Sequence, residues 1–113
     1  MAKYGSISFK GGSGSAYKMI VFPFQTKFKP GIGGVYLVTK RRVKEDGSVA
    51  HEYLYVGSSS DLRENFRFHP RAVQFDSYKA TSICVYRETD EAKRKEIFED
   101  LRGHYRPLLN EMF

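Results

Sequence analysis

Residues 34–57 decide the fold, and they read GVYLVTKRRVKEDGSVAHEYLYVG. β-Branched and aromatic side chains dominate segments 34–40 and 51–56, which is typical of β-strands. Between these segments, the Asp-Gly pair at 46–47 favours the tight turn of a β-hairpin. The stretch therefore predicts two antiparallel strands joined by a short turn.

An N-terminal hairpin is expected before this stretch. Segments 4–9 and 17–24 are β-prone, and the Gly/Ser-rich run 11–15 between them favours a flexible turn. That run lacks the Lys-Ser/Thr ending of a phosphate-binding loop, and no predicted helix follows it, so it predicts a turn only. Residues 1–30 are therefore interpreted as a hairpin extension with a linker that contains proline and glycine.

Two helices and one more strand are expected after the central hairpin. The Ser-Ser-Ser-Asp run 58–61 supplies N-cap residues for a short helix over about 61–68, which ends near Pro70, and segment 81–87 is a further β-prone run. A longer helix spans 91–105, where acidic residues in the first turn complement the helix dipole. Residues 71–78 fit no single element. The apolar stripe of the long helix comprises Ile97, Leu101, Tyr105 and Leu108, with Phe98 at its edge.

These elements predict a single α+β domain over residues 1–113. Its expected core is a small three-stranded antiparallel sheet flanked by helices, to which the N-terminal hairpin is added. A chain of this length buries enough surface to hold one core without disulfides. Its single cysteine, Cys84, lies in an apolar run, which predicts a buried thiol.

Charge and composition favour a nucleic-acid partner in the cytoplasm. The net charge is +6, and residues 1–50 hold nine Lys or Arg against two acidic residues. A basic half is typical of proteins that bind a polyanion. The longest apolar run, 19–24, is too short to cross a membrane, and the N-terminus has no apolar signal segment. We therefore expect a cytoplasmic protein that contacts DNA and has no membrane role.

Two tripeptides, Gly34-Val35-Tyr36 and Tyr55-Val56-Gly57, lie on the paired strands, and a Ser-Ser-Ser-Asp-Leu helix start follows them. This arrangement resembles the GIY-YIG endonuclease family over residues 34–110. Segment 4–28 is similar to the hairpin extension of some small stand-alone members. Further matches to the family pattern are His69, Arg94, Ile97, Asp100, Leu101, Pro107 and Asn110.

The family hydrolyses DNA phosphodiesters with the help of a metal ion, and the resemblance implies roles for four residues. Tyr36 would sit near the attacking water or act as its base, and Tyr55 would orient the phosphate. Gly57 would let the phosphate approach the backbone closely. His69 would lie at the rim and assist proton transfer. The alternative for Tyr36 and Tyr55 is an aromatic cross-strand pair that closes the sheet.

Two positions depart from the family pattern. Asn65 stands where the family has an arginine on the first helix, and Phe98 stands where it has a metal-binding glutamate on the long helix. Losing the transition-state cation costs about 3–4 kcal/mol, and losing the metal ligand costs more. We therefore expect catalytic activity at least ~10⁴-fold below that of an intact relative.

Neighbouring residues do not replace the missing groups. Arg63 and Arg67 each lie two positions from Asn65, roughly 200° around a helix, so they point away from it. Glu99 lies one position from Phe98, roughly 100° around, and would need a local bulge to reach the cleft. The sequence therefore predicts no metal site, with Glu99 the nearest candidate ligand, and no cofactor except Mg²⁺ if any activity is retained.

The resulting interpretation is a DNA-binding protein on a nuclease fold whose catalysis is lost. The resemblance places a basic shoulder beside the phosphate cleft, and the basic run 93–95 predicts an exposed helix face. Two alternatives stay open: an active Mg²⁺-dependent endonuclease that uses Glu99, and a non-catalytic protein-interaction module in which Phe98 forms an apolar docking surface for a second copy or a protein partner. The predicted DNA-binding residues are those of the basic shoulder, Lys40, Arg41, Arg42 and Lys44, together with Gly57.

Overall fold

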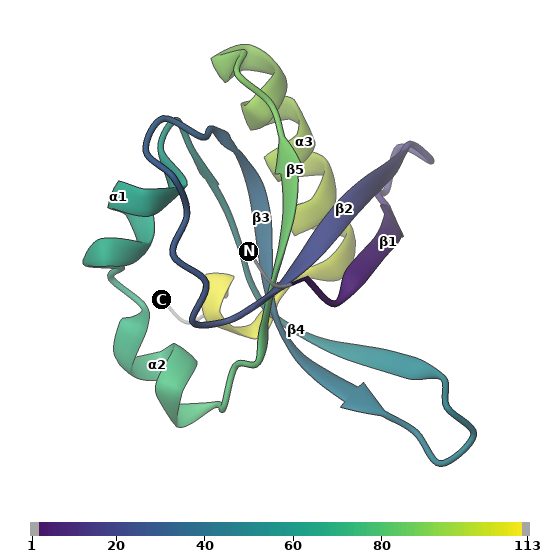
Figure 1. Cartoon of the computed structure of the whole chain (residues 1–113). Coiled ribbons are helices and arrows are strands. Elements are labelled where there is room, and N and C mark those ends of the chain that lie inside the picture. Colours follow the sequence, from purple (N-terminus) through teal and green to yellow (C-terminus); the bar gives the residue numbers. More distant parts are fainter. Residues whose placement is uncertain (1–2, 112–113) are drawn as a thin grey trace.

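The computed structural model of the chain describes residues 3–111 and shows an α+β fold (Figure 1). Its elements follow the order predicted from the sequence, and the open segment 71–78 contains a helix. The strands are β1 (Gly5–Lys10), β2 (Ala16–Pro23), β3 (Gly34–Val43), β4 (Val49–Ser59) and β5 (Ser82–Arg87). The helices are α1 (Leu62–Arg67), α2 (Ala72–Ser77) and α3 (Glu91–Tyr105), followed by a 3-10 turn, η1 (Leu108–Asn110).

The five strands form one antiparallel sheet in the order β1-β2-β5-β3-β4, curled into a half-barrel. The predicted three-stranded sheet with a separate hairpin is therefore wrong. β2 pairs with β5, from Ile20↔Val85 to Pro23↔Ser82, so the N-terminal hairpin continues the sheet. The first four residues of β5 are all buried, and a strand buried on both faces needs a neighbour on each edge to pair its backbone groups.

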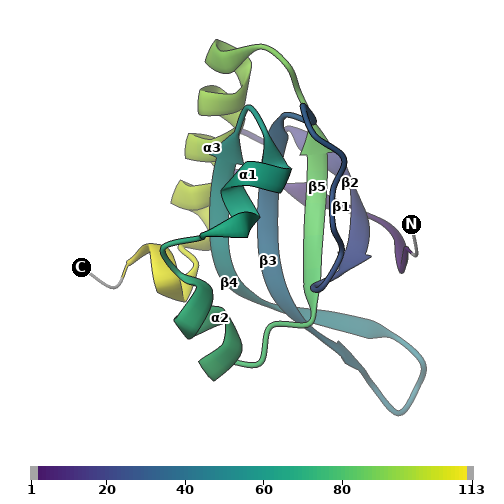
Figure 2. The ribbon, with the colours of Figure 1, turned by 60° about the vertical axis from the view of Figure 1, so that its left-hand side comes forward.

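Helices cover both faces of the sheet, and strand β3 carries apolar side chains toward both of them. Side chains alternate along β3. Tyr36 and Val38 face a core under α1, α2 and η1, whereas Val35 and Leu37 face a second core under α3. Figure 2 shows the same arrangement, with α3 on one face and α1 and α2 on the other.

The apolar stripe predicted for α3 is confirmed in its middle and wrong at its end. Ile97 and Leu101 are buried, but Leu108 is 47% exposed. The chain leaves the helix at Arg106, which has a φ of 45°, and enters η1, where Leu109 is buried instead. The change of direction at Arg106 therefore moves the buried position by one residue.

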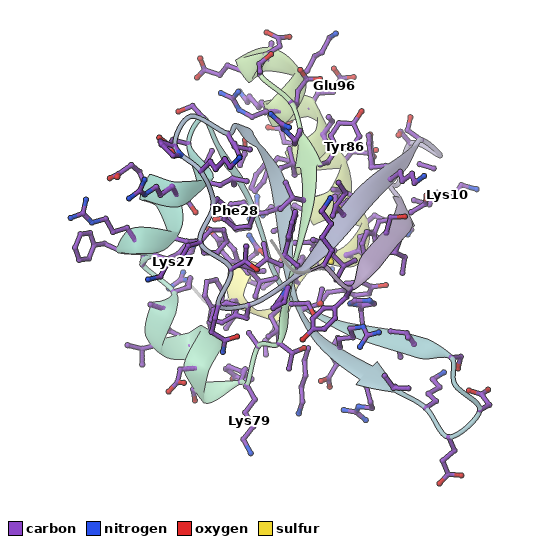
Figure 3. All side chains as sticks on the ribbon, in the orientation of Figure 1. Lys10, Lys27, Phe28, Lys79, Tyr86 and Glu96 are labelled. Atoms are coloured by element: carbon purple, nitrogen blue, oxygen red, sulfur yellow. The ribbon has the colours of Figure 1, made fainter. Side chains whose placement is uncertain are left out.

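The division between core and surface otherwise follows residue polarity. Cys84 is buried as predicted, and burial raises the pKa of its thiol to about 12. In Figure 3, Phe28 lies inside the first core, whereas Lys10 and Lys79 point away from the body. Among residues 3–111, no helix is long and apolar enough to span a membrane.

Two polar side chains fasten peripheral segments to the sheet and to α3. The Asp100 carboxylate accepts hydrogen bonds from the Ser13 backbone N–H at 2.8 Å, the Ser13 hydroxyl at 2.7 Å and the Tyr17 hydroxyl at 2.6 Å. Asn110 accepts from the Val56 N–H at 2.8 Å and donates to the Val56 carbonyl at 2.9 Å. Asp100 thus anchors the β1–β2 loop, and Asn110 closes part of the open edge of β4.

Candidate functional site

A cavity of about 540 Å³ lies beside the edge strand β4, between α1 and the N-terminal part of α3. Every position that the resemblance assigns to chemistry lines it, although these positions come from β3, β4, α1, the loop after α1, and α3. They are Tyr36, Tyr55, Gly57, Asn65, His69 and Phe98. The fold therefore brings together residues of two neighbouring strands, two helices and a loop that lie far apart in the sequence.

His69 is buried, with 6% of its surface exposed. Its Nδ1 accepts a hydrogen bond from the Arg71 backbone N–H at 3.0 Å, so the neutral ring carries its proton on Nε2. Nε2–H then donates to the Tyr36 hydroxyl oxygen, 2.7 Å away. Burial, and secondarily the Arg71 charge, lower the pKa of His69 to about 4. The predicted place at the rim is therefore wrong, because His69 is a buried, neutral donor to Tyr36.

Tyr36 is held as a neutral phenol. Its side chain is 1% exposed, and burial, followed by the proximity of Tyr55, raises its pKa far above the ordinary value. A hydrogen bond from the Asn65 side chain opposes this rise. Because the phenol oxygen accepts from His69, its own hydrogen is directed to another acceptor. Tyr36 therefore suits a hydrogen-bond donor better than a general base.

The missing side chain at Gly57 makes room for Tyr36. The two residues are paired across β3 and β4, and a Cβ atom at Gly57 would overlap the ring and hydroxyl of Tyr36. The Tyr36 ring also packs against Phe66, with centroids 4.7 Å apart, so it has little room to move aside. Gly57 thus has a packing role that the sequence did not predict.

The aromatic contact given as the alternative interpretation of the two motif tyrosines is present. The ring centroids of Tyr36 and Tyr55 lie 6.1 Å apart, and the His69 ring lies 5.1 Å from that of Tyr55. Tyr55 is only partly buried and lines the cavity. Packing and ligand contact are therefore compatible: Tyr36 belongs to the core, and Tyr55 offers the larger surface to a ligand.

Further lining residues come from positions that the sequence analysis did not assign to the site. Glu91 and Lys95 are exposed and line the cavity together with Phe98, and so does the serine run 58–60. Lys95 lies three residues before Phe98, and Glu91 lies four residues before Lys95, so all three share one face of the helix. The position of Phe98 on the helix could therefore have identified both charged residues. Lys95 brings a positive charge to the cavity.

Arg94 is buried, and it ties the start of α3 to the connection from β5. Its side chain is 7% exposed, and its Nη1 donates to the backbone oxygens of Glu88 at 3.1 Å and Thr89 at 2.7 Å. The prediction that the basic run 93–95 is an exposed face is therefore wrong at Arg94, because the guanidinium satisfies backbone acceptors at a helix start.

The donors around the cavity do not fit a Mg²⁺ ion. Phe98 places an aromatic ring where the resemblance implies the metal-binding carboxylate, and Glu99 lines a separate cavity. Glu91 is the one carboxylate among residues 3–111 that lines the site, and Arg94 and Lys95 line it one helical turn away. Mg²⁺ is held by carboxylate and phosphate oxygens, and two cations beside a single carboxylate compete with it. We assign no metal-dependent step to these residues.

The basic shoulder is displaced along β3 from the cavity and does not line it. Beyond the rest of the sheet, β3 and β4 continue as an arm (Figure 1). At about 3.3 Å per residue, Lys40 and Arg42 lie roughly 13 and 20 Å along the strand from Tyr36. Alternation puts Lys40 and Arg42 on the Tyr36 face of β3 and Arg41 on the other. The expected position beside the cleft is thereby corrected.

No protein-family model, curated protein or solved structure matches the chain. The resemblance to GIY-YIG endonucleases therefore rests on the sequence motifs alone.

The buried neutral His69 makes folding stability depend on pH. Its pKa of about 4 lies below the ordinary 6.5, so the unfolded chain takes up a proton first as the pH falls. Stability is therefore unaffected by His69 above about pH 6.5, and it falls by up to roughly 3 kcal/mol as the pH drops toward 4. Denaturant unfolding from about pH 7.5 to about pH 4.5 should show a larger loss for wild type than for His69→Gln.

Equal losses of folding stability in wild type and His69→Gln would contradict a buried, neutral His69 imidazole. Burial, and secondarily Arg41, also lower the pKa of His51. Because His51 is present in both proteins, its contribution cancels in the comparison.

Proposed function

We propose that this protein binds DNA on a GIY-YIG nuclease fold and has lost the ability to hydrolyse it. The observation that supports this most is the composition of the cavity. The motif residues line it together with the two positions at which the sequence departs from the family, and these positions hold Asn65 and Phe98.

The cavity offers groups that bind a phosphate. Lys95 supplies a positive charge, and Tyr55 and the serine run 58–60 supply hydroxyl donors. Lys40 and Arg42 continue along the same face of β3 as Tyr36. A DNA backbone that has one phosphate in the cavity can therefore meet further cations along the arm, and such backbone contacts are the largest source of affinity for DNA.

Two features of the same cavity argue against hydrolysis. Asn65 provides an amide where a transition-state cation is needed, and its Oδ1 is buried without a hydrogen-bond partner among the described residues. Phe98 provides no ligand for a metal.

Neither alternative has comparable support. An active endonuclease that uses Glu99 needs this carboxylate in the cavity, but Glu99 lines a different one with Arg102 and Arg106. A protein-interaction module that docks through Phe98 needs an exposed apolar ring. Phe98 is instead partly buried against the core residues of α3 and the sheet.

The salt dependence of DNA binding tests the proposal. If about five basic groups contact phosphates, log K for duplex DNA should fall with log salt concentration with a slope of about −4.5. The double variant Lys40→Gln, Lys44→Gln should reduce the magnitude of this slope by about 2, because each lost contact removes about 0.9. Lys10→Gln, on the opposite edge strand β1, is the matched control and should leave the slope unchanged. Undetectable binding at low salt, or a slope near zero, would sink the proposal.

A further inference from the structure

Phe68 is the most exposed large apolar side chain among residues 3–111, with 82% of its surface accessible. It follows the last residue of α1 and directly precedes His69 and Pro70, which both line the cavity. The ring is therefore presented to solvent, although the next two residues of the chain line the candidate site.

The surrounding structure holds Phe68 outward. Its neighbours Phe66 and His69 occupy the inner positions and stack on each other, with ring centroids 5.6 Å apart. The His69 ring accepts from the Arg71 N–H, and the His69 carbonyl accepts from the Ala72 N–H at 3.0 Å. These contacts fix the turn that follows Phe68, so the ring is supported by a rigid backbone.

One cation lies directly beside the Phe68 ring. The Arg67 guanidinium carbon lies 5.3 Å from the ring centroid, a cation–π distance, and its side chain is 63% exposed although it also pairs with Glu64 at 3.6 Å. Arg63 lies one turn earlier on the same face of α1 and is exposed. An exposed ring among arginines is complementary to a nucleotide, which has a flat base and a negative phosphate.

We propose that Phe68 is a stacking platform for an unpaired nucleobase, and that the protein therefore prefers single-stranded or locally unpaired DNA to intact duplex. This inference rests on the proposed DNA binding and specifies its partner. A base inside a duplex is already stacked and cannot use the platform, whereas an unpaired base can lie on the ring while its phosphates contact Arg63 and Arg67. Phenylalanine and arginine are also enriched at protein interfaces, so binding of a second copy of the chain is the competing outcome of the experiment.

Fluorescence anisotropy with a labelled single-stranded oligonucleotide of mixed sequence, and with its duplex, tests the platform at constant salt. Phe68→Ala should weaken single-strand binding by about 5- to 150-fold, since each stacked base contributes about 1–3 kcal/mol. Phe68→Ala should leave duplex binding and the melting temperature unchanged, because the side chain is exposed. Phe68→Trp should retain single-strand binding. Val73→Ala, at a position 78% exposed on α2, is the matched control and should bind as wild type.

The platform is overturned if Phe68→Ala binds the single strand as tightly as wild type, or if Phe68→Leu does. It is also overturned if Phe68→Ala changes self-association, measured by light scattering, and not DNA affinity, because the ring then serves a second copy of the chain. Wild-type protein that binds the duplex while the Phe68 variants show no effect leaves the proposed function standing. If the wild-type protein binds neither the single strand nor the duplex, the stacking platform and the proposed function are both overturned.

Discussion

The double variant Asn65→Arg, Phe98→Glu is expected to cleave DNA in the presence of Mg²⁺, whereas the wild-type protein leaves DNA intact. Both positions line the cavity that holds Tyr36 and Tyr55, so the variant adds a cation and a carboxylate to the same site. The absence of both groups is expected to lower the rate at least ~10⁴-fold, and their return should recover a measurable part of it. Conversion of supercoiled plasmid to nicked and linear forms, with and without EDTA, measures the gain.

Control variants distinguish cleavage by the restored site from cleavage by a contaminating nuclease. Each single variant should stay near wild type, because a cation and a metal ligand are both needed. Glu99→Gln in the double-variant background should retain activity, since Glu99 lines another cavity, whereas Tyr36→Phe in that background should lose it. A double variant that folds, as judged by circular dichroism and thermal melting, and yet stays inert would mean that the active site of the fold is misplaced.

Gly57→Ala is expected to destabilise the protein by about 1–3 kcal/mol, which is the usual cost of overpacking a core. The added Cβ would overlap the Tyr36 ring, and that ring is fixed by Phe66 and by the hydrogen bond from His69. Urea denaturation at neutral pH measures the change in the free energy of unfolding.

A second glycine supplies the matched control for this substitution. Gly103 lies in α3, where a Cβ would meet nothing within 4 Å, so Gly103→Ala should stabilise the protein by about 0.5–1 kcal/mol through helix propensity. Combining Gly57→Ala with Tyr36→Ala should cost less than the sum of the two changes, because the overlap then disappears. If Gly57→Ala proves as stable as wild type, the Tyr36 ring is not packed over Gly57.

Local sequence patterns predicted the elements well, because their signals lie within a few residues. The Asp-Gly turn placed the β3–β4 hairpin, and the Ser-Ser-Ser-Asp run 58–61 placed α1, where the Asp61 side chain accepts from the Glu64 N–H at 3.3 Å. The number of strands in the sheet was missed. The pairing of β2 with β5 joins segments separated by two strands and two helices in the sequence, and no local signal encodes it.

Motif spacing grouped six residues that line one cavity, because the spacing fixes which ends of β3, β4, α1 and α3 meet. It missed Glu91 and Lys95, and it placed the basic shoulder beside a cleft that the shoulder does not line. Spacing did not show that His69 is buried or that Arg94 binds backbone oxygens, since both depend on packing between elements. Phe68 also gave no signal, because exposure of a single aromatic residue depends on which neighbours occupy the core.

One titration of end-labelled DNA with wild-type protein, in Mg²⁺ at low salt, reports both binding and cleavage. Anisotropy of each sample reports binding, and a denaturing gel of the same sample reports strand breakage. We expect the anisotropy to rise to saturation while the full-length strand persists. Strand breaks that Tyr36→Phe abolishes, or an anisotropy that never rises, would contradict the account.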